Sequence, residues 1–224
     1  MAKPLLVLGK SGTGKSTSLR NLPPDQTLII TPNAKELPWR GSATQYQVGK
    51  NVIRTTDMHA VATYIEQAAK ASQFKFVVVE DTTHYQNERM MEDSFIASKD
   101  WGKWNRFGAD FFKMVAKNME NYRDDLWVIF VAHTDAKDDG TVGLRTAGKL
   151  LDNSIDIPSY FTTIFHSLVI KDEGKLKYKF QTNNDGYLLA KTPLGMFEDL
   201  YVDNDIAEIV NIIADYSTSA PDKK

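Results

Sequence analysis

Residues 5–16 read Leu-Leu-Val-Leu-Gly-Lys-Ser-Gly-Thr-Gly-Lys-Ser, a short aliphatic run followed at once by a glycine-rich segment. A short continuous apolar run is typical of a strand in a parallel sheet, because such a strand is covered on both faces. Residues 9–16 match the phosphate-binding pattern G-x-x-x-x-G-K-[ST] at every fixed position. The sequence therefore predicts a buried strand, a phosphate-binding loop and a short helix over residues 15–21, in direct succession.

The glycine-rich segment has the residue types that phosphate binding requires. Small residues let successive backbone N–H groups converge on phosphate oxygens, and the positive end of a following helix adds to the attraction. Lys15 is expected to reach the β- and γ-phosphates of a nucleoside triphosphate, and the Ser16 hydroxyl is suited to bind Mg²⁺. The residues expected to contact the nucleotide are Gly9, Lys10, Ser11, Gly12, Thr13, Gly14, Lys15, Ser16 and Thr17.

An acidic pair follows a strongly apolar run. Residues 74–79 predict a buried strand, and Glu80 and Asp81 come directly after it. A Mg²⁺ ion at the phosphate loop needs an acid at the tip of a neighbouring strand, and we assign that role to Asp81. Because side chains alternate along a strand, Glu80 would point to the opposite face unless the strand ends there. Glu80 is then either the base that activates water or a structural acid, and Glu36 is the competing base.

The rest of the chain predicts an α/β domain with a mainly parallel sheet flanked by helices. Further strands are predicted at residues 27–31 and 126–132, helices at 59–71 and 107–122, and loop at 33–51. Towards the C-terminus we expect a β-hairpin (residues 161–170 and 175–182), a strand (187–191) and an amphipathic helix (205–216). We predict a single domain over residues 1–216 and a flexible tail over 217–224.

Composition sets limits on function. The 224 residues contain no cysteine, which excludes disulfides and cysteine nucleophiles, and 42% are hydrophobic, as in ordinary globular proteins. No stretch has the length of apolar residues that a membrane span or signal segment needs, so we expect a cytoplasmic protein without membrane contact. The net charge of −2 means that any contact with nucleic acid requires a local basic patch.

The order of these parts resembles that of the RecA-like P-loop ATPases, especially the compact phage-type proteins linked to single-strand annealing and recombination. The resemblance extends from Lys3 to about Glu198. It implies a RecA-like domain that binds ATP and Mg²⁺, hydrolyses ATP and acts on single-stranded DNA. It also implies a homo-oligomeric ring or filament in a phage-infected bacterial cytoplasm, with a single-strand-binding protein as a further candidate partner.

The resemblance also assigns roles to particular residues. His133 lies where these proteins carry a sensor of the γ-phosphate, at the end of the strand after the long helix; the alternative is a histidine that caps a strand. Lys191 matches the lysine of a hairpin that reaches the ATP of a neighbouring subunit in hexameric relatives, although Pro193 occupies the position of the partner arginine. The acid usual at the end of the second strand is absent, because Thr31, Pro32 and Asn33 occupy that place.

Two segments occupy the positions of the DNA-facing loops, residues 82–106 and 135–149. Near the end of the first, aromatic and basic residues interleave, a pattern suited to stacking on bases while holding phosphates. The alternative is that the tryptophans pack in the core and the cations are solvated. The candidate DNA contacts are Lys99, Trp101, Lys103, Trp104 and Arg106 in the first segment, and Lys137, Arg145 and Lys149 in the second.

Two other functions are compatible with the same loop. A small-molecule or nucleoside kinase usually carries several arginines in a lid, whereas the arginines here are dispersed. A nucleotide-gated loader or clamp for a partner protein would hydrolyse ATP slowly, and the missing acid of the second strand favours that function somewhat. ATPase assays with and without single-stranded DNA would separate the three.

Overall fold

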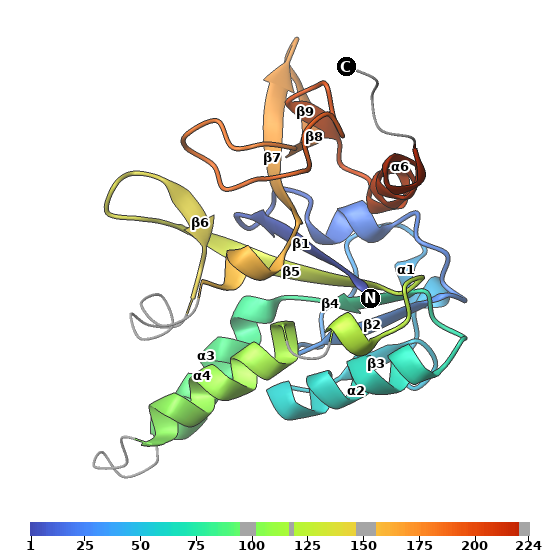
Figure 1. The fold of residues 1–224 in the computed structure, drawn as a ribbon, viewed down its shortest axis with the longest axis vertical. Coiled ribbons are helices and arrows are strands. Elements are labelled where there is room, and N and C mark those ends of the chain that lie inside the picture. The colour runs from blue at the N-terminus through green and yellow to red at the C-terminus, as the bar shows by residue number, and fades with distance from the viewer. Residues whose placement is uncertain (95–101, 117–118, 147–155, 220–224) are drawn as a thin grey trace.

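A mixed, mainly parallel sheet forms the centre of the computed structural model, which describes residues 1–94, 102–116, 119–146 and 156–219. The strand order is β3-β2-β4-β5-β1-β7-β8-β9, with β6 paired to β5 (Figure 1). The parallel strands are β1 (Lys3–Gly9), β2 (Thr27–Thr31), β3 (Val52–Arg54), β4 (Phe76–Val79), β5 (Trp127–Ala136) and β7 (Thr163–Asp172). Three strands run antiparallel to their neighbours: β6 (Val142–Leu144), β8 (Lys175–Gln181) and β9 (Tyr201–Asp203). The predicted α/β class is confirmed.

Helices cover both faces of the sheet. On one face lie α2 (Met58–Lys70), α3 (Thr82–Ser94) and α4 (Gly102–Val115), and on the other lies α6 (Ile206–Thr218) (Figure 1). Along β1, Leu6 and Leu8 join the core under α2–α4, whereas Leu5 and Val7 join the core under α6. Because alternate side chains of each central strand are buried on opposite faces, these strands contain continuous apolar runs.

Helices α2 and α6 each begin at a capping aspartate. The Asp57 side chain accepts a hydrogen bond from His59 N at the start of α2 (2.8 Å), and the Asp205 side chain accepts one from Ala207 N at the start of α6 (3.0 Å). A cap of this kind typically stabilises a helix by about 1 kcal/mol. Helix α6 continues to Thr218, so the predicted tail begins two residues too early.

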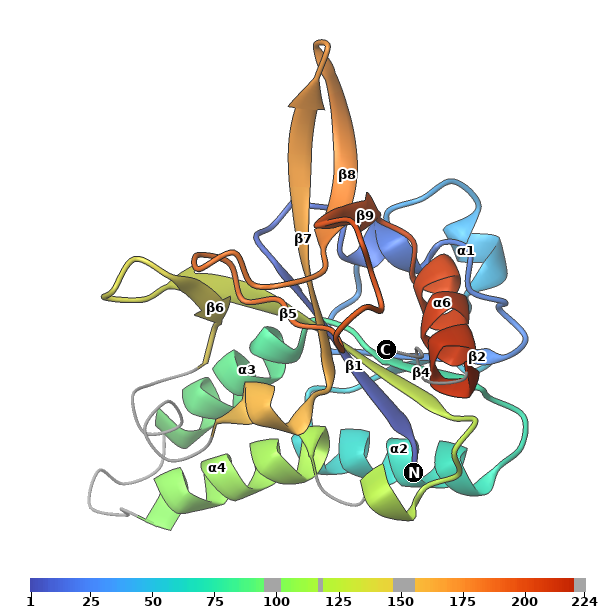
Figure 2. The ribbon, with the colours of Figure 1, turned by 45° about the horizontal axis from the view of Figure 1, so that its top comes forward.

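The β7–β8 hairpin agrees with prediction and projects from the body of the molecule (Figure 2). Its turn contains Glu173 (φ 47°) and Gly174 (φ 80°), the left-handed conformations that a tight hairpin turn requires. The outer part of β8 exposes Leu176 and Tyr178. By contrast, the predicted strand over residues 187–191 is absent, and isolated bridges from Leu188 to Val142 and from Lys191 to Ile164 take its place.

Residues 82–106, expected as a DNA-facing loop, are largely helical in their described part, which comprises α3 and the start of α4. The sequence of α3 is polar and lacks an apolar stripe, although Tyr85 and Gln86 are fully buried. The second expected loop, residues 135–149, contains β6 and the end of β5. The segment 33–51, expected as loop, contains the short helix α1 (Ser42–Gln45).

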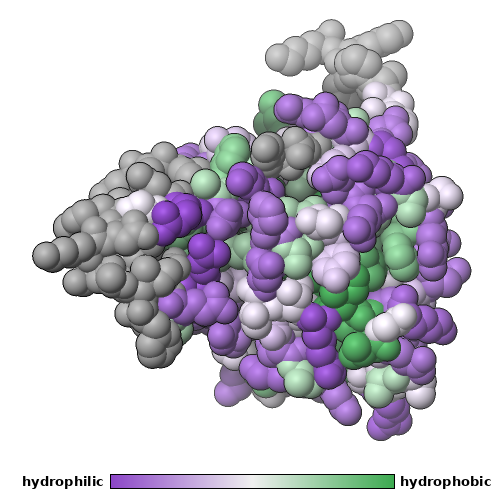
Figure 3. All heavy atoms as spheres, turned by 90° about the horizontal axis from the view of Figure 1, so that it is seen from below, coloured by the Kyte–Doolittle hydropathy of each residue, from purple (hydrophilic) through white to green (hydrophobic). Residues whose placement is uncertain are grey.

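The surface on the side of α2 and α4 is mainly polar (Figure 3). Figure 3 shows the molecule from the side of α2 and α4, where hydrophilic side chains cover most of the coloured surface and hydrophobic ones gather in one small area. Within the described residues, no helix is long and apolar enough to cross a membrane.

Candidate functional site

The glycine-rich loop leaves the sheet at the C-terminal end of β1, between β5 and β7. A Cβ atom at Gly9 would lie 2.6 Å from the backbone oxygen of Ser167, and one at Gly14 would lie 2.8 Å from Cδ1 of Tyr178. Gly14 also has a φ of 92°, which other residues rarely adopt. Close packing therefore explains why these two positions are glycine.

Two residues distant in sequence hold the loop in shape. The Ser167 hydroxyl, on β7, donates a hydrogen bond to the carbonyl oxygen of Thr13 (2.6 Å). The Asn204 side chain, just before α6, in turn donates to the Ser167 hydroxyl (3.0 Å). Within the loop, the Thr13 hydroxyl donates to the carbonyl of Lys10 (2.9 Å). The loop is thus preorganised by the protein itself.

The predicted helix after the loop is reduced to a single 3-10 turn, η1 (Ser16–Leu19). Leu22 N donates to the Leu19 carbonyl, and Pro23 and Pro24, which lack an N–H group, follow. Because a helix dipole grows from many aligned peptides, so short a turn contributes little to anion binding. Any attraction for phosphate must come from the backbone N–H groups of the loop and from Lys15.

Lys15 is almost fully buried, with 8% of its surface exposed, at the floor of the loop. Its Nζ atom donates a hydrogen bond to the carbonyl of Lys10 (2.8 Å). Burial lowers the pKa of Lys15, and the nearby carboxylates of Glu80 and Asp81 partly oppose that shift. The burial places an ammonium group at the glycine loop in a poorly solvated position, where it interacts strongly with an incoming anion.

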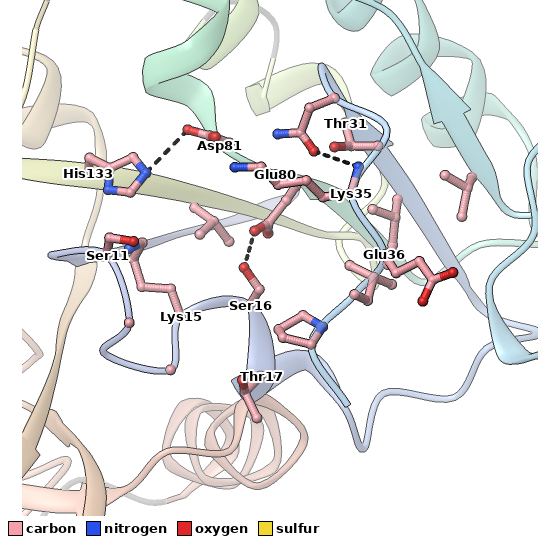
Figure 4. A pocket seen from close by; sticks show the side chains of 18 of the residues that line it. Ser11, Lys15, Ser16, Thr17, Thr31, Lys35, Glu36, Glu80, Asp81 and His133 are labelled. Carbon is pink, nitrogen blue, oxygen red and sulfur yellow. Dashed lines mark hydrogen bonds and ion pairs between the residues drawn. The ribbon is translucent and has the colours of Figure 1, made fainter. Parts of the chain in front are cut away.

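Glu80 lies against Ser16, and the Ser16 hydroxyl donates a hydrogen bond to Glu80 Oε1 (Figure 4). Burial, followed by the neighbouring charge of Asp81, raises the pKa of Glu80 to about 7, while Ser16 and Lys15 act in the opposite direction. The second carboxylate oxygen, Oε2, is buried and has no hydrogen-bond partner among the described residues. A buried carboxylate oxygen without a partner, beside a serine hydroxyl, fits the second coordination sphere of a metal ion.

The strand end explains why Glu80, rather than Asp81, faces Ser16. Strand β4 ends at Val79, and Asp81 has a φ of 54°, so the alternation of side chains does not continue through the acidic pair. Asp81 turns towards His133, whose Nε2 atom lies 3.6 Å from Asp81 Oδ1 (Figure 4). The metal-side role was predicted for Asp81, whereas the carboxylate that contacts Ser16 in the structure is that of Glu80.

His133 lies within β5, beside the acidic pair. Its backbone N–H donates to the hydroxyl of Thr83 (3.0 Å). Burial lowers the pKa of His133, and the positive charges of Lys15, Arg145 and Lys35 add to that effect, whereas Asp81 opposes it. The His133 ring therefore gives up its proton more readily than a free histidine does.

A pocket of about 480 Å³ opens between the loop and the ends of β2, β4 and β5. This volume lies within the usual range for small-molecule sites. We call it the main pocket; its lining includes Lys15, Ser16, Glu80, Asp81 and His133 (Figure 4). Among the described residues, no group of three or more His, Asp or Glu side chains is arranged to hold a metal ion. A metal here would rely on Ser16 and on ligand oxygens, as Mg²⁺ usually does.

The sequence did not point to Tyr178, Ser167 or Asn204. Tyr178 lies on the projecting hairpin and lines the main pocket next to Gly14. Its proximity depends on how the β7–β8 hairpin lies beside the glycine loop, for which the sequence carries no local signal. Ser167 and Asn204 are buried polar residues, a weak signal without the structure.

Few of the other predicted residues lie at the main pocket. Glu36 lines the main pocket but is exposed, and its carboxylate points away from Lys15 (Figure 4). Lys191 lines neither the main pocket nor the one beside it. Arg106 and Lys137 are exposed away from the loop. Lys99, Trp101 and Lys149 lie outside the described residues, as do the side chains of Lys103 and Trp104, so the interleaved pattern stays a prediction.

Comparison of the chain with protein-family models finds no match, and comparison with curated protein sequences finds none either.

Proposed function

We propose that this chain is a P-loop ATPase of the RecA-like kind, with ATP and Mg²⁺ in the main pocket. The observation that carries the proposal is the preorganised glycine loop at the C-terminal end of β1, with the buried Lys15 below it and the Ser16–Glu80 pair beside it. Ligands of open α/β sheets bind at this edge, outside the carboxyl ends of the strands. Backbone donors, a buried cation and a hydroxyl–carboxylate pair are together suited to a polyphosphate with its metal.

Each residue has a role that follows from its position. Lys15 would exchange its bond to the Lys10 carbonyl for the β- and γ-phosphates. Ser16 would bind Mg²⁺ directly and Glu80 through water, and the ion would supply neutralisation of phosphate charge. Asp81 and His133 would orient the attacking water and respond to the terminal phosphate. Glu36 would need to rotate inward to serve as the base.

The proposal is tested by titrating the purified protein with a fluorescent ATP analogue and by measuring phosphate release from ATP, each with Mg²⁺ and with EDTA. We expect saturable binding that Mg²⁺ strengthens, together with Mg²⁺-dependent release. A protein that binds no nucleotide under either condition would refute the proposal.

The proposed action on single-stranded DNA, in phage-type recombination or replication, is supported by the resemblance to annealing and recombination ATPases. The candidate contacts are those named above. Stimulation of ATP hydrolysis by single-stranded oligonucleotides, but not by duplexes of the same sequence, is the expected result.

A nucleotide-gated loader or clamp is the second candidate function. Thr31 ends β2 where an acid is usual, and Glu36 points away from the loop, so the described pocket has no base aimed at the terminal phosphate apart from the Asp81–His133 pair. Very slow hydrolysis that single-stranded DNA does not accelerate would favour this function over a DNA-stimulated ATPase.

We predict that ATP hydrolysis per subunit falls as the protein is diluted. Among the described residues that line the main pocket, the cations are Lys15 and Lys35, and no arginine reaches it. In P-loop enzymes an additional cation commonly completes the charge stabilisation of the transition state. Lys191 is a candidate from a neighbouring subunit, because two backbone hydrogen bonds to Ile164 hold its position (2.8 and 2.9 Å). If turnover per subunit stays constant over a dilution of about a hundredfold, active sites shared between subunits are excluded.

We also predict that Tyr178→Ala weakens ATP binding by about 3- to 10-fold, the usual effect of losing an aromatic contact. The ring is 46% exposed and lies against Gly14, at the second half of the loop, where a ribose or base would pack. Tyr178→Phe keeps the ring and should bind ATP normally in the same fluorescence titration. Equal affinity of the alanine variant and the wild type would show that the ring does not touch the nucleotide.

A further inference from the structure

A second hollow, which we call the side pocket, adjoins the main pocket and has a volume of about 420 Å³. Ser11, Asp81 and His133 line both pockets. Lys10, Thr134 and Arg145 line only the side pocket. The two hollows therefore meet at the start of the glycine loop and at the Asp81–His133 pair.

The side pocket lies at the terminal-phosphate end of the proposed nucleotide site. The ammonium group of Lys15, which would contact the β- and γ-phosphates, is bonded to the carbonyl of Lys10. Lys10 belongs to the side pocket, whereas Tyr178, at the other half of the loop, belongs only to the main pocket. A ligand in the side pocket would thus approach the γ-phosphate rather than the base.

Cations from two separate elements converge on this hollow. Lys10 comes from the glycine loop and Arg145 follows β6, and no ion pair of either side chain is found in the described part of the chain. The backbone N–H of Arg145 donates to the carbonyl of His133 (2.9 Å), which fixes the chain position of Arg145 beside the ring. Arg145 therefore reaches the side pocket from its own subunit.

The negative charge in the side pocket is smaller than the positive charge. Asp81 is the acid among its described lining residues, and it already faces His133 (3.6 Å). Two cations, Lys10 and Arg145, line this pocket against that one carboxylate, which favours a positive potential there. Such a potential attracts an anion.

An unused hydrogen-bond donor completes the lining. The hydroxyl of Thr134 is buried and has no hydrogen-bond partner among the described residues. Buried polar groups in proteins are nearly always paired, so the unpaired hydroxyl of a residue that lines this hollow is a candidate donor to a ligand there. Together, an ammonium, a guanidinium and a free hydroxyl match the acceptor oxygens of a phosphate group.

We propose that the side pocket binds a second phosphate group, next to the γ-phosphate of the bound nucleotide. The inference rests on the proposed function, because it takes the main pocket as the nucleotide site. The second phosphate belongs either to free inorganic phosphate, such as the product of hydrolysis, or to a small phosphomonoester. Both share the chemistry that Lys10, Thr134 and Arg145 recognise.

The test uses full-length protein saturated with the non-hydrolysable analogue AMP-PNP and Mg²⁺, so that the γ-phosphate position is occupied. Binding of AMP-PNP is titrated first, which separates failure of the nucleotide site from failure of the side pocket. Binding of radiolabelled inorganic phosphate to the complex is then measured by equilibrium dialysis. Ribose 5-phosphate is used as the competitor, and stronger binding of that ester than of phosphate identifies a phosphomonoester as the ligand.

Arg145→Gln should weaken phosphate binding by about tenfold or more, the usual effect of losing a charge-assisted hydrogen bond. Lys137→Gln is the matched control, because it removes one positive charge from the same β5–β6 hairpin outside the side pocket, and it should change binding less than twofold. The proposal is overturned if the AMP-PNP complex binds no phosphate, or if the two variants weaken binding equally. Equal weakening would mean that phosphate responds only to overall charge.

Discussion

Replacing Lys15 with alanine should lower the affinity for ATP by about a hundredfold or more, because a buried cation next to phosphate interacts much more strongly than an exposed one. The side chain is 8% exposed, and its ammonium group donates a hydrogen bond to the Lys10 carbonyl of the loop. Glu80 and Asp81 repel an anion, and the positive charge of Lys15 now offsets part of that repulsion. The alanine variant lacks this charge. The measurement is an equilibrium titration with a fluorescent ATP analogue.

Lys35→Ala provides the control for the Lys15 variant. Lys35 lines the same pocket but is exposed, so solvent screens its charge, and we expect a change in ATP affinity of less than about threefold. Circular dichroism and thermal unfolding of both variants establish that they are folded. Unchanged affinity in a folded Lys15→Ala protein would mean that the loop does not hold the polyphosphate.

Glu80→Gln should slow ATP hydrolysis by about a hundredfold or more, while ATP binding in EDTA changes little, because the amide keeps the shape but loses the charge that positions the metal. The Ser16 hydroxyl contacts this side chain directly. Asp81→Asn is the informative comparison. A larger loss of Mg²⁺-dependent binding in Asp81→Asn than in Glu80→Gln would return the metal-side role to Asp81, as the sequence had suggested.

The same substitution should change how stability depends on pH. Glu80 has a pKa of about 7 in the folded protein, against an ordinary value of 4.5. Between these values the folded state holds a proton that the unfolded state has lost, so the free energy of unfolding falls as pH rises and levels off above about 7. The loss amounts to about 3 kcal/mol. In urea unfolding without nucleotide or Mg²⁺, Glu80→Gln should lack this decrease; identical pH profiles of variant and wild type would contradict it.

The pattern of apolar runs was sufficient to predict the central strands and the loop. β1, β2, β4 and β5 are buried on both faces over most of their length, so their sequences contain continuous apolar runs that stand out from their surroundings. Strands β3 and β9 have three residues each and lie towards the edges of the sheet, where so short a segment has no recognisable period. Helix α3 escaped detection because it is buried largely through polar side chains such as Thr82, Thr83 and Gln86.

The candidate site was predicted only in part, because spacing along the chain reveals some of its residues and not others. The motif identifies Lys15 and Ser16 through local spacing, which the sequence displays directly. The choice between Glu80 and Asp81 depends on the backbone angle of Asp81, where the strand has already ended, and alternation gives the opposite answer. The side pocket requires Lys10, Thr134 and Arg145 to meet through strand pairing, which spacing along the chain does not reveal.

The supports of the glycine loop have a consequence for the order of folding during synthesis. Ser167 and Asn204 emerge from the ribosome more than 150 residues after the loop that they support, since Ser167 and Thr13 are 154 positions apart. Nascent chains halted before Ser167 are therefore expected to carry the complete motif and yet bind no ATP analogue. Capture of such arrested chains on an ATP resin would show that the motif acquires its shape without the C-terminal region. If no such chains are captured, the glycine loop is translated early but becomes able to bind a nucleotide only after the C-terminal region has been made.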